Sequence, residues 1–143
     1  MAVQRRFSCS GEQIFAVLRD GWIYPVWVVG ASRMRDVDNG WPAPGTKLHH
    51  SFGIWPLVID DTTEVLEIEP DRRLVLEARG WPVGKARVQI TVQPDGDDSL
   101  VSIAEDVTEG PARLVPEPIR LAGMDVRNRE SLRRLAYLAE NHH

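Results

Sequence analysis

Residues 117–141, EPIRLAGMDVRNRESLRRLAYLAEN, decide the fold of this chain. Apolar residues recur here at steps of three and four, which places them on one face of a helix with about 3.6 residues per turn. Most of the remaining chain reads as strands, so this face has to be buried against a sheet. We therefore predict a curved antiparallel sheet around a C-terminal helix, an arrangement that readily encloses a cavity. The predicted inner face comprises Leu121, Met124, Asn128, Leu132, Leu135 and Leu138.

The length and composition are those of one soluble globular domain. The chain has 143 residues, of which 43% are hydrophobic and 27% are charged. No stretch approaches the roughly 18 consecutive apolar residues that a membrane-spanning helix needs, so we expect no integral membrane association. The first residues, MAVQRRFSCS, place two arginines where a signal peptide needs apolar residues. We therefore expect a cytoplasmic protein with a single domain over residues 1–143.

Charge and cysteine content exclude several classes of partner. The formal net charge is −4 and no basic stripe is visible, so nucleic acid is not an expected partner. Cys9 is the only cysteine, which excludes an internal disulfide and a multi-thiolate metal site. His49 and His50 are adjacent, and neighbouring residues of a strand point to opposite faces, so they cannot share one ion. We expect neither a metal site nor a cofactor.

Upstream of the helix, the pattern predicts seven strands and two short helical segments. Residues 2–7 alternate apolar and polar side chains as a first strand does. Ser10 and Gln13 have the spacing of a capping box, which opens a helix that ends at residues 20–21. A second helical turn is predicted around Pro25. The other strands are predicted at residues 32–38, 46–54, 62–69, 72–79, 83–93 and 99–107.

Three polar residues interrupt the apolar faces that should point inward. His50 lies between Leu48 and Phe52 in the alternating pattern, and Glu105 follows Ile103 in the last strand. Asn128 interrupts the inner face of the helix. A buried polar group needs a hydrogen-bond partner, so each of the three is a structural group, a ligand contact or, for His50 and Glu105, a proton-transfer group. These alternatives stay open at the level of sequence.

The candidate ligand-binding residues come from these inward faces and from tryptophans near strand ends. Trp27, Trp55 and Trp81 are expected to seal the ends of the sheet or to stack on a ligand, and in both cases to shape the mouth of the cavity. By contrast, Arg127, Arg129, Glu130, Arg133 and Arg134 are predicted to form the solvated outer face of the helix. The predicted ligand-binding set is Trp27, Leu48, His50, Phe52, Trp81, Ile103, Glu105, Met124 and Asn128.

Several local sequences make the chain resemble a known superfamily. They are residues 15–18 (FAVL), 21–27 (GWIYPVW), 41–45 (WPAPG), 69–74 (EPDRRL) and 127–132 (RNRESL). Together with the element order, they resemble the helix-grip fold of the START-like (SRPBCC) superfamily, which includes polyketide cyclases, lipid-transfer proteins and Bet v 1 allergens. They look like its bacterial polyketide cyclase/dehydrase-like branch. The resemblance implies an α+β domain with a cavity for a hydrophobic ligand, and it leaves the ligand unspecified.

Two functions are compatible with this container architecture. The first is binding of a small hydrophobic or amphipathic molecule, such as a lipid, a polyketide or an aromatic metabolite, by a monomer or homodimer. The alternative is a cyclase or dehydratase in which His50 or Glu105 moves a proton. No GxSxG, P-loop, dinucleotide or HExxH motif occurs, so other common enzyme classes lack support. Whether the protein is an enzyme remains open at this stage.

Overall fold

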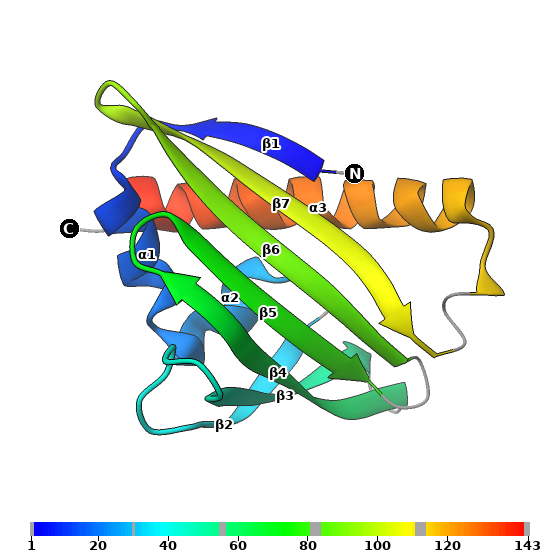
Figure 1. The fold of residues 1–143 in the computed structure, drawn as a ribbon. Coiled ribbons are helices and arrows are strands. Elements are labelled where there is room, and N and C mark those ends of the chain that lie inside the picture. The colour runs from blue at the N-terminus through cyan, green and yellow to red at the C-terminus, as the bar shows by residue number, and fades with distance from the viewer. Residues whose placement is uncertain (1, 30, 55–56, 81–83, 111–113, 142–143) are drawn as a thin grey trace.

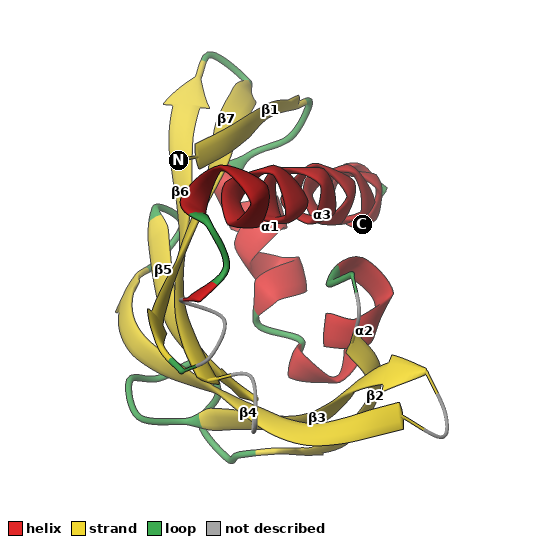
Figure 2. Cartoon of the chain, turned by 90° about the vertical axis from the view of Figure 1, so that its right-hand side faces the viewer, coloured by secondary structure: helices red, strands yellow, loops and turns green. Residues whose placement is uncertain are grey.

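A seven-stranded antiparallel sheet curves around the C-terminal helix α3 (Glu117–Glu140), as Figures 1 and 2 show. The structure is a computed structural model, and it describes residues 2–29, 31–54, 57–80, 84–110 and 114–141. The short helices α1 (Gly11–Leu18), η1 (Gly21–Ile23) and α2 (Tyr24–Trp27) lie on the same concave side as α3. The strands are β1 (Ala2–Phe7), β2 (Ala31–Val37), β3 (Lys47–Ile54), β4 (Leu57–Glu69), β5 (Arg73–Gly80), β6 (Gly84–Asp95) and β7 (Asp98–Glu109).

The strand order explains how one sheet can surround a helix. The order is β1-β7-β6-β5-β4-β3-β2, so every strand from β2 to β7 pairs with its neighbour in sequence. Among the described strands, only β1 makes a distant pairing, with Val3 opposite Ile103 in β7. This arrangement confirms the predicted fold class, a helix-grip fold with two short helical segments after the first strand.

Strand β4 begins at Leu57, earlier than the predicted start at residue 62. The prediction stopped at Asp60 and Asp61, because aspartate is depleted in strands. In the structure, pairing with β3 carries the strand through both aspartates, with Asp60 opposite Ser51 and Asp61 opposite His50. The Ser51 hydroxyl also donates a hydrogen bond to the Asp60 carboxylate at 2.8 Å. Cross-strand contacts therefore override the local preference.

The predicted capping box forms at the start of α1. The Gln13 backbone N–H donates to the Ser10 hydroxyl at 3.2 Å, and the Gln13 side-chain oxygen accepts from the Ser10 backbone N–H at 3.1 Å. Two helix-end donors are satisfied in this way. The helix buries Ile14, Phe15, Val17 and Leu18.

We expect Ser10→Ala to lower the free energy of unfolding by about 1 kcal/mol, because the Gln13 N–H then loses its acceptor. Urea denaturation followed by circular dichroism measures this change. Ser10→Asn keeps a side-chain acceptor at this position and should lose clearly less. An equal loss in both variants would contradict the assigned capping role.

Helix α3 divides into a packed half and an exposed half. Leu132, Leu135, Ala136 and Ala139 in the C-terminal half are buried, and this helix contacts α1, α2, β1 and β7. The N-terminal half is more exposed, and Ile119 in its first turn is 66% exposed. Within the described residues, no helix is long and apolar enough to cross a lipid bilayer. The packed half anchors α3, and the residues between the two halves border a pocket.

Candidate functional site

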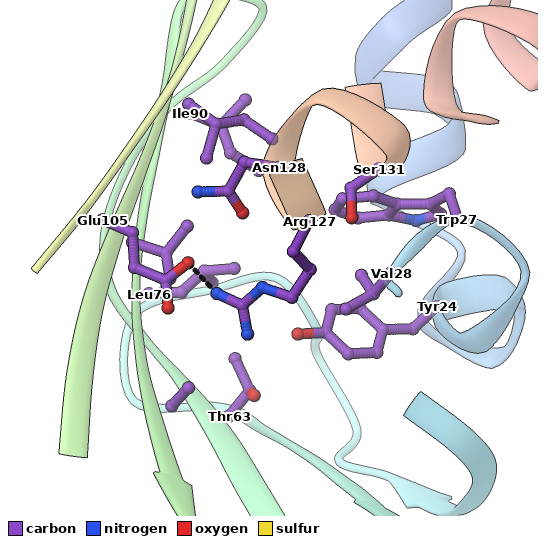
Figure 3. A pocket seen from close by; sticks show the side chains of 13 residues that line it. Tyr24, Trp27, Val28, Thr63, Leu76, Ile90, Glu105, Arg127, Asn128 and Ser131 are labelled. Carbon is purple, nitrogen blue, oxygen red and sulfur yellow. Dashed lines mark hydrogen bonds and ion pairs between the residues drawn. The ribbon is translucent and has the colours of Figure 1, made fainter. Parts of the chain in front are cut away.

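A pocket of about 60 Å³ lies between the concave face of the sheet and helices α2 and α3 (Figure 3). Strands β5, β6 and β7 contribute an apolar wall that only Glu105 of β7 interrupts among the lining residues, whereas the side facing α2, α3 and β4 carries hydroxyl, amide and guanidinium groups. A small cavity with one apolar wall and a few convergent polar groups is typical of ligand sites. The lining residues are Tyr24, Trp27, Val28, Thr63, Leu76, Ala78, Val88, Ile90, Ile103, Glu105, Arg127, Asn128 and Ser131.

Four of the predicted ligand-binding residues line this pocket: Trp27, Ile103, Glu105 and Asn128. In β7 the side chains at positions 101, 103, 105 and 107 are buried while Asp106 is exposed, so the alternation places Glu105 on the inner face. Asn128 is only 7% exposed and points from α3 into the same space. The structure thus brings together residues from α2, β7 and α3.

The other predicted residues lie elsewhere or outside the described part of the chain. Leu48 is completely buried in the core. Met124 is half-buried on α3 and is not among the described residues that line the pocket. The side chain of Phe52, together with Trp55 and Trp81, lies outside the described residues.

His50 supports the pocket wall from behind. Its Nε2 atom lies 2.7 Å from the Thr63 hydroxyl, and its ring stacks on Tyr24 with centroids 5.2 Å apart. The residue is completely inaccessible to solvent. Burial, helped by the positive charge of Arg35, lowers the pKa of His50 to about 4. The imidazole is therefore neutral near pH 7, and it positions Tyr24 and Thr63, which do line the pocket.

The prediction that Arg127 belongs to the solvated face of α3 is wrong. Its guanidinium reaches across the pocket and donates from Nη2 to Oε1 of Glu105 (Figure 3). The Glu105 side chain is 7% exposed and that of Arg127 is 38% exposed. A buried carboxylate requires a compensating charge, and the long arginine stem lets a residue at the border of the buried face supply it. By contrast, Arg133 and Arg134 pair with the Glu130 carboxylate.

Sequence reasoning also missed Tyr24 and Thr63. Thr63 shares the inner face of β4 with buried Val65, so strict alternation could have identified it. Tyr24 follows a 3-10 turn, and no periodicity indicates its direction. Burial raises the pKa of Tyr24 to about 12, with Thr63 as the partner of its hydroxyl group. Tyr24 is therefore a protonated hydroxyl at the pocket wall.

Asn128 and Ser131 complete the polar side of the pocket. The Ser131 hydroxyl accepts a hydrogen bond from the Val29 backbone N–H at 3.2 Å. Among the described residues, the Asn128 amide has no hydrogen-bond partner, although the residue is 7% exposed. A buried amide in this state is available to a ligand or to water in the pocket.

The remaining candidate reactive groups lie outside the pocket. The Cys9 thiol is buried, and burial raises its pKa to about 11, which keeps it protonated and unreactive. His49 lies on the opposite face of β3 from His50, with its Nε2 atom 2.8 Å from the Asp38 carboxylate. Throughout the described ranges, no three histidine, cysteine, aspartate or glutamate side chains are placed to hold a metal ion.

A curved antiparallel sheet that grips a C-terminal helix, with a pocket between them, defines the helix-grip class of folds. Residues 1–140 match the family described as polyketide cyclase / dehydrase and lipid transport, and the chain belongs to this family. A comparison with curated proteins finds no match.

Solved structures with the same fold share little sequence with this chain. Protein CV1439 from Chromobacterium violaceum is 18% identical, with a TM-score of 0.74 and coverage of 98% of this chain and 96% of that chain. StfQ, a di-domain ARO/CYC from the steffimycin biosynthetic pathway, is 10% identical with a TM-score of 0.76. The match covers 98% of this chain and 50% of StfQ. DynU16, a putative protein in the dynemicin biosynthetic locus, is 17% identical with a TM-score of 0.69. The match covers 99% of this chain and 47% of DynU16.

Proposed function

We propose that this protein binds a small hydrophobic or amphipathic molecule in the pocket between the sheet and α3. The observation that carries the proposal is the asymmetry of the pocket. Leu76, Ile90 and Ile103 provide an apolar surface, and Arg127 and Asn128 face it with polar groups that can orient a ligand. The family description, which names lipid transport beside cyclase activity, supports this proposal.

The volume of the pocket limits the size of its ligand. About 60 Å³ is far below the roughly 300–1,000 Å³ of typical small-molecule sites. The Arg127 side chain occupies part of the space between the sheet and α2. The pocket is smaller than the roughly 150 Å³ cavity that accepts a benzene ring, so a single aromatic ring or a short chain needs small side-chain movements around it. A longer lipid or polyketide would need Arg127 to swing outward.

A screen of small aromatic and short-chain compounds by thermal shift and native mass spectrometry tests the proposal, since a ligand that binds only the folded state raises the melting temperature. Ala78→Phe fills the pocket from β5 and should abolish the shift. Ala122→Phe places the same side chain at an exposed site on α3 and should leave the shift unchanged. Equal shifts in the two variants would place the ligand elsewhere.

A second candidate, a cyclase or dehydratase, is favoured by the position of Glu105. Its carboxylate faces the pocket beside the Arg127 cation, which could stabilise a developing enolate. His50 lies behind Tyr24 and Thr63, so Glu105 is the better placed of the two predicted proton-transfer residues. Exchange of the acetophenone methyl protons in D₂O, followed by NMR, tests this chemistry. If the protein only binds its ligand, the methyl protons exchange at the rate measured in buffer. If the protein accelerates this exchange, and the acceleration is lost in Glu105→Gln but kept in His50→Gln, the protein is an enzyme that uses Glu105.

The cytoplasmic location and the single domain over residues 1–143 belong to the same proposal, as does a monomeric or homodimeric state. Size-exclusion chromatography with light scattering measures the mass in solution. A single species of 16.1 kDa or twice that mass is expected. A larger assembly would contradict the expected state.

A further inference from the structure

The guanidinium of Arg127 has unused hydrogen-bond donors inside the pocket. One nitrogen donates to Glu105, and no other described residue accepts a hydrogen bond from this side chain. Figure 3 shows the remainder of the group between the hydroxyls of Tyr24 and Thr63. Because a guanidinium carries five N–H donors in a rigid plane, several are directed at the space that a ligand would occupy.

The charges around this space do not favour an anion. Glu105 already neutralises Arg127, so the pair contributes no net charge. Asp61 lies opposite His50 in the pairing of β3 with β4, and its charge acts on Tyr24. Burial raises the pKa of Asp61 to about 6, which leaves it mostly ionised at neutral pH. Arg35 and Arg79 also act on Asp61, but they are paired with the carboxylates of Asp60 and Glu77. A ligand carboxylate would therefore enter a site with no excess of positive charge.

We propose that the pocket selects ligands with a neutral carbonyl oxygen over ligands with a carboxylate, and that Arg127 is the residue that determines this preference. The carbonyl oxygen accepts from the free N–H groups of Arg127 and from the Tyr24 hydroxyl, while the apolar part of the ligand packs against Leu76, Ile90 and Ile103. Glu105 holds the guanidinium in place and cancels its attraction for anions. The inference rests on the proposed ligand-binding function and specifies its ligand class.

Three compounds of similar shape separate the contributions: acetophenone with a ketone, benzoate with a carboxylate, and ethylbenzene with no polar group. Their dissociation constants at pH 7.5 are measured by NMR titration of the ¹⁵N-labelled protein. We expect acetophenone to bind about tenfold more tightly than either of the other compounds, as one well-placed hydrogen bond to a charged group allows.

Two substitutions should change this preference in different directions. Glu105→Gln keeps the shape of the side chain and leaves Arg127 with an uncompensated charge, so benzoate should gain about a hundredfold and become the tightest ligand. Arg127→Met should remove the advantage of acetophenone over ethylbenzene. Arg133→Met is the matched control, because Arg133 pairs with Glu130 on the exposed side of the same helix. It should preserve the wild-type order of affinities.

The outcomes distinguish the preference from the binding function itself. If acetophenone leads in the wild type and benzoate leads in Glu105→Gln, the inference holds. If the three compounds bind equally, or benzoate already leads in the wild type, binding stands and the inference is overturned. If none of the three binds any variant, the proposed function fails and takes the inference with it. Melting temperatures identify a variant that fails to fold. If Arg127→Met does not fold, the ligand order in Glu105→Gln decides whether the inference holds.

Discussion

Leu135→Ala is expected to lower the free energy of unfolding by about 3–5 kcal/mol, the range in which large-to-small changes in a packed core fall. Leu135 is completely buried in the packed half of α3, which contacts α1 and β1. The substitution removes buried apolar surface and leaves a cavity that its neighbours only partly fill. Because a domain of this size is stable by about 5–15 kcal/mol, the change is a large fraction of the total.

Urea denaturation at pH 7.5 measures this effect, with Tyr137→Ala as the control on the same helix. Tyr137 is 68% exposed, so its truncation should change the free energy of unfolding by no more than about 0.5 kcal/mol. A loss below about 1 kcal/mol for Leu135→Ala would show that the sheet does not anchor the helix. The position of Arg127 and Asn128, two turns upstream, would then lack its structural basis.

The parts of the fold that were predictable depend on short periodic patterns. Alternation in β7 places Ile103 and Glu105 on one face independently of the rest of the chain, because side chains in a strand repeat with a period of two residues. The capping box of Ser10 and Gln13 spans four residues and is complete within them. The steps of three and four in α3 likewise predict that Leu132 and Leu135 are buried, which the structure confirms. In each case the decisive interaction is local.

The polar side of the pocket was less predictable because its contacts join distant parts of the chain. Arg127 pairs with a residue 22 positions away, and only its proximity to a buried carboxylate turns it inward. Its place on the helix, one residue from Asn128, is compatible with either direction. A useful signal was still present: Glu105 was predicted to face inward, and a buried carboxylate requires a nearby cation. A search of the facing helix for that cation would have included Arg127 among the candidate arginines.

The buried imidazole of His50 should make stability depend on pH. Its pKa is lowered from 6.5 to about 4 in the folded protein, so the unfolded chain binds the proton more tightly. The stabilisation is fully present above about pH 6.5 and is lost as the pH falls toward about 4, by about 3 kcal/mol in total. Asp61 acts in the opposite direction: burial raises its pKa to about 6, so its contribution to stability grows as the pH falls through the same range.

The difference between the wild type and His50→Gln isolates the histidine, because Asp61 is present in both proteins. Glutamine can place its amide near the Nε2 position and keep the contact with the Thr63 hydroxyl, but it does not titrate. The wild type should lose about 3 kcal/mol relative to His50→Gln between pH 7 and pH 4, measured by urea denaturation at each pH. Repeating the comparison with Asp61→Asn in both proteins removes the coupling between these cross-strand neighbours.

A difference in the free energy of unfolding that does not change with pH would mean that the folded protein accepts a proton on His50. This residue would then again be a candidate for proton transfer. A difference of the expected size keeps His50 neutral behind the pocket wall and leaves Glu105 and Arg127 as the charged groups that meet the ligand.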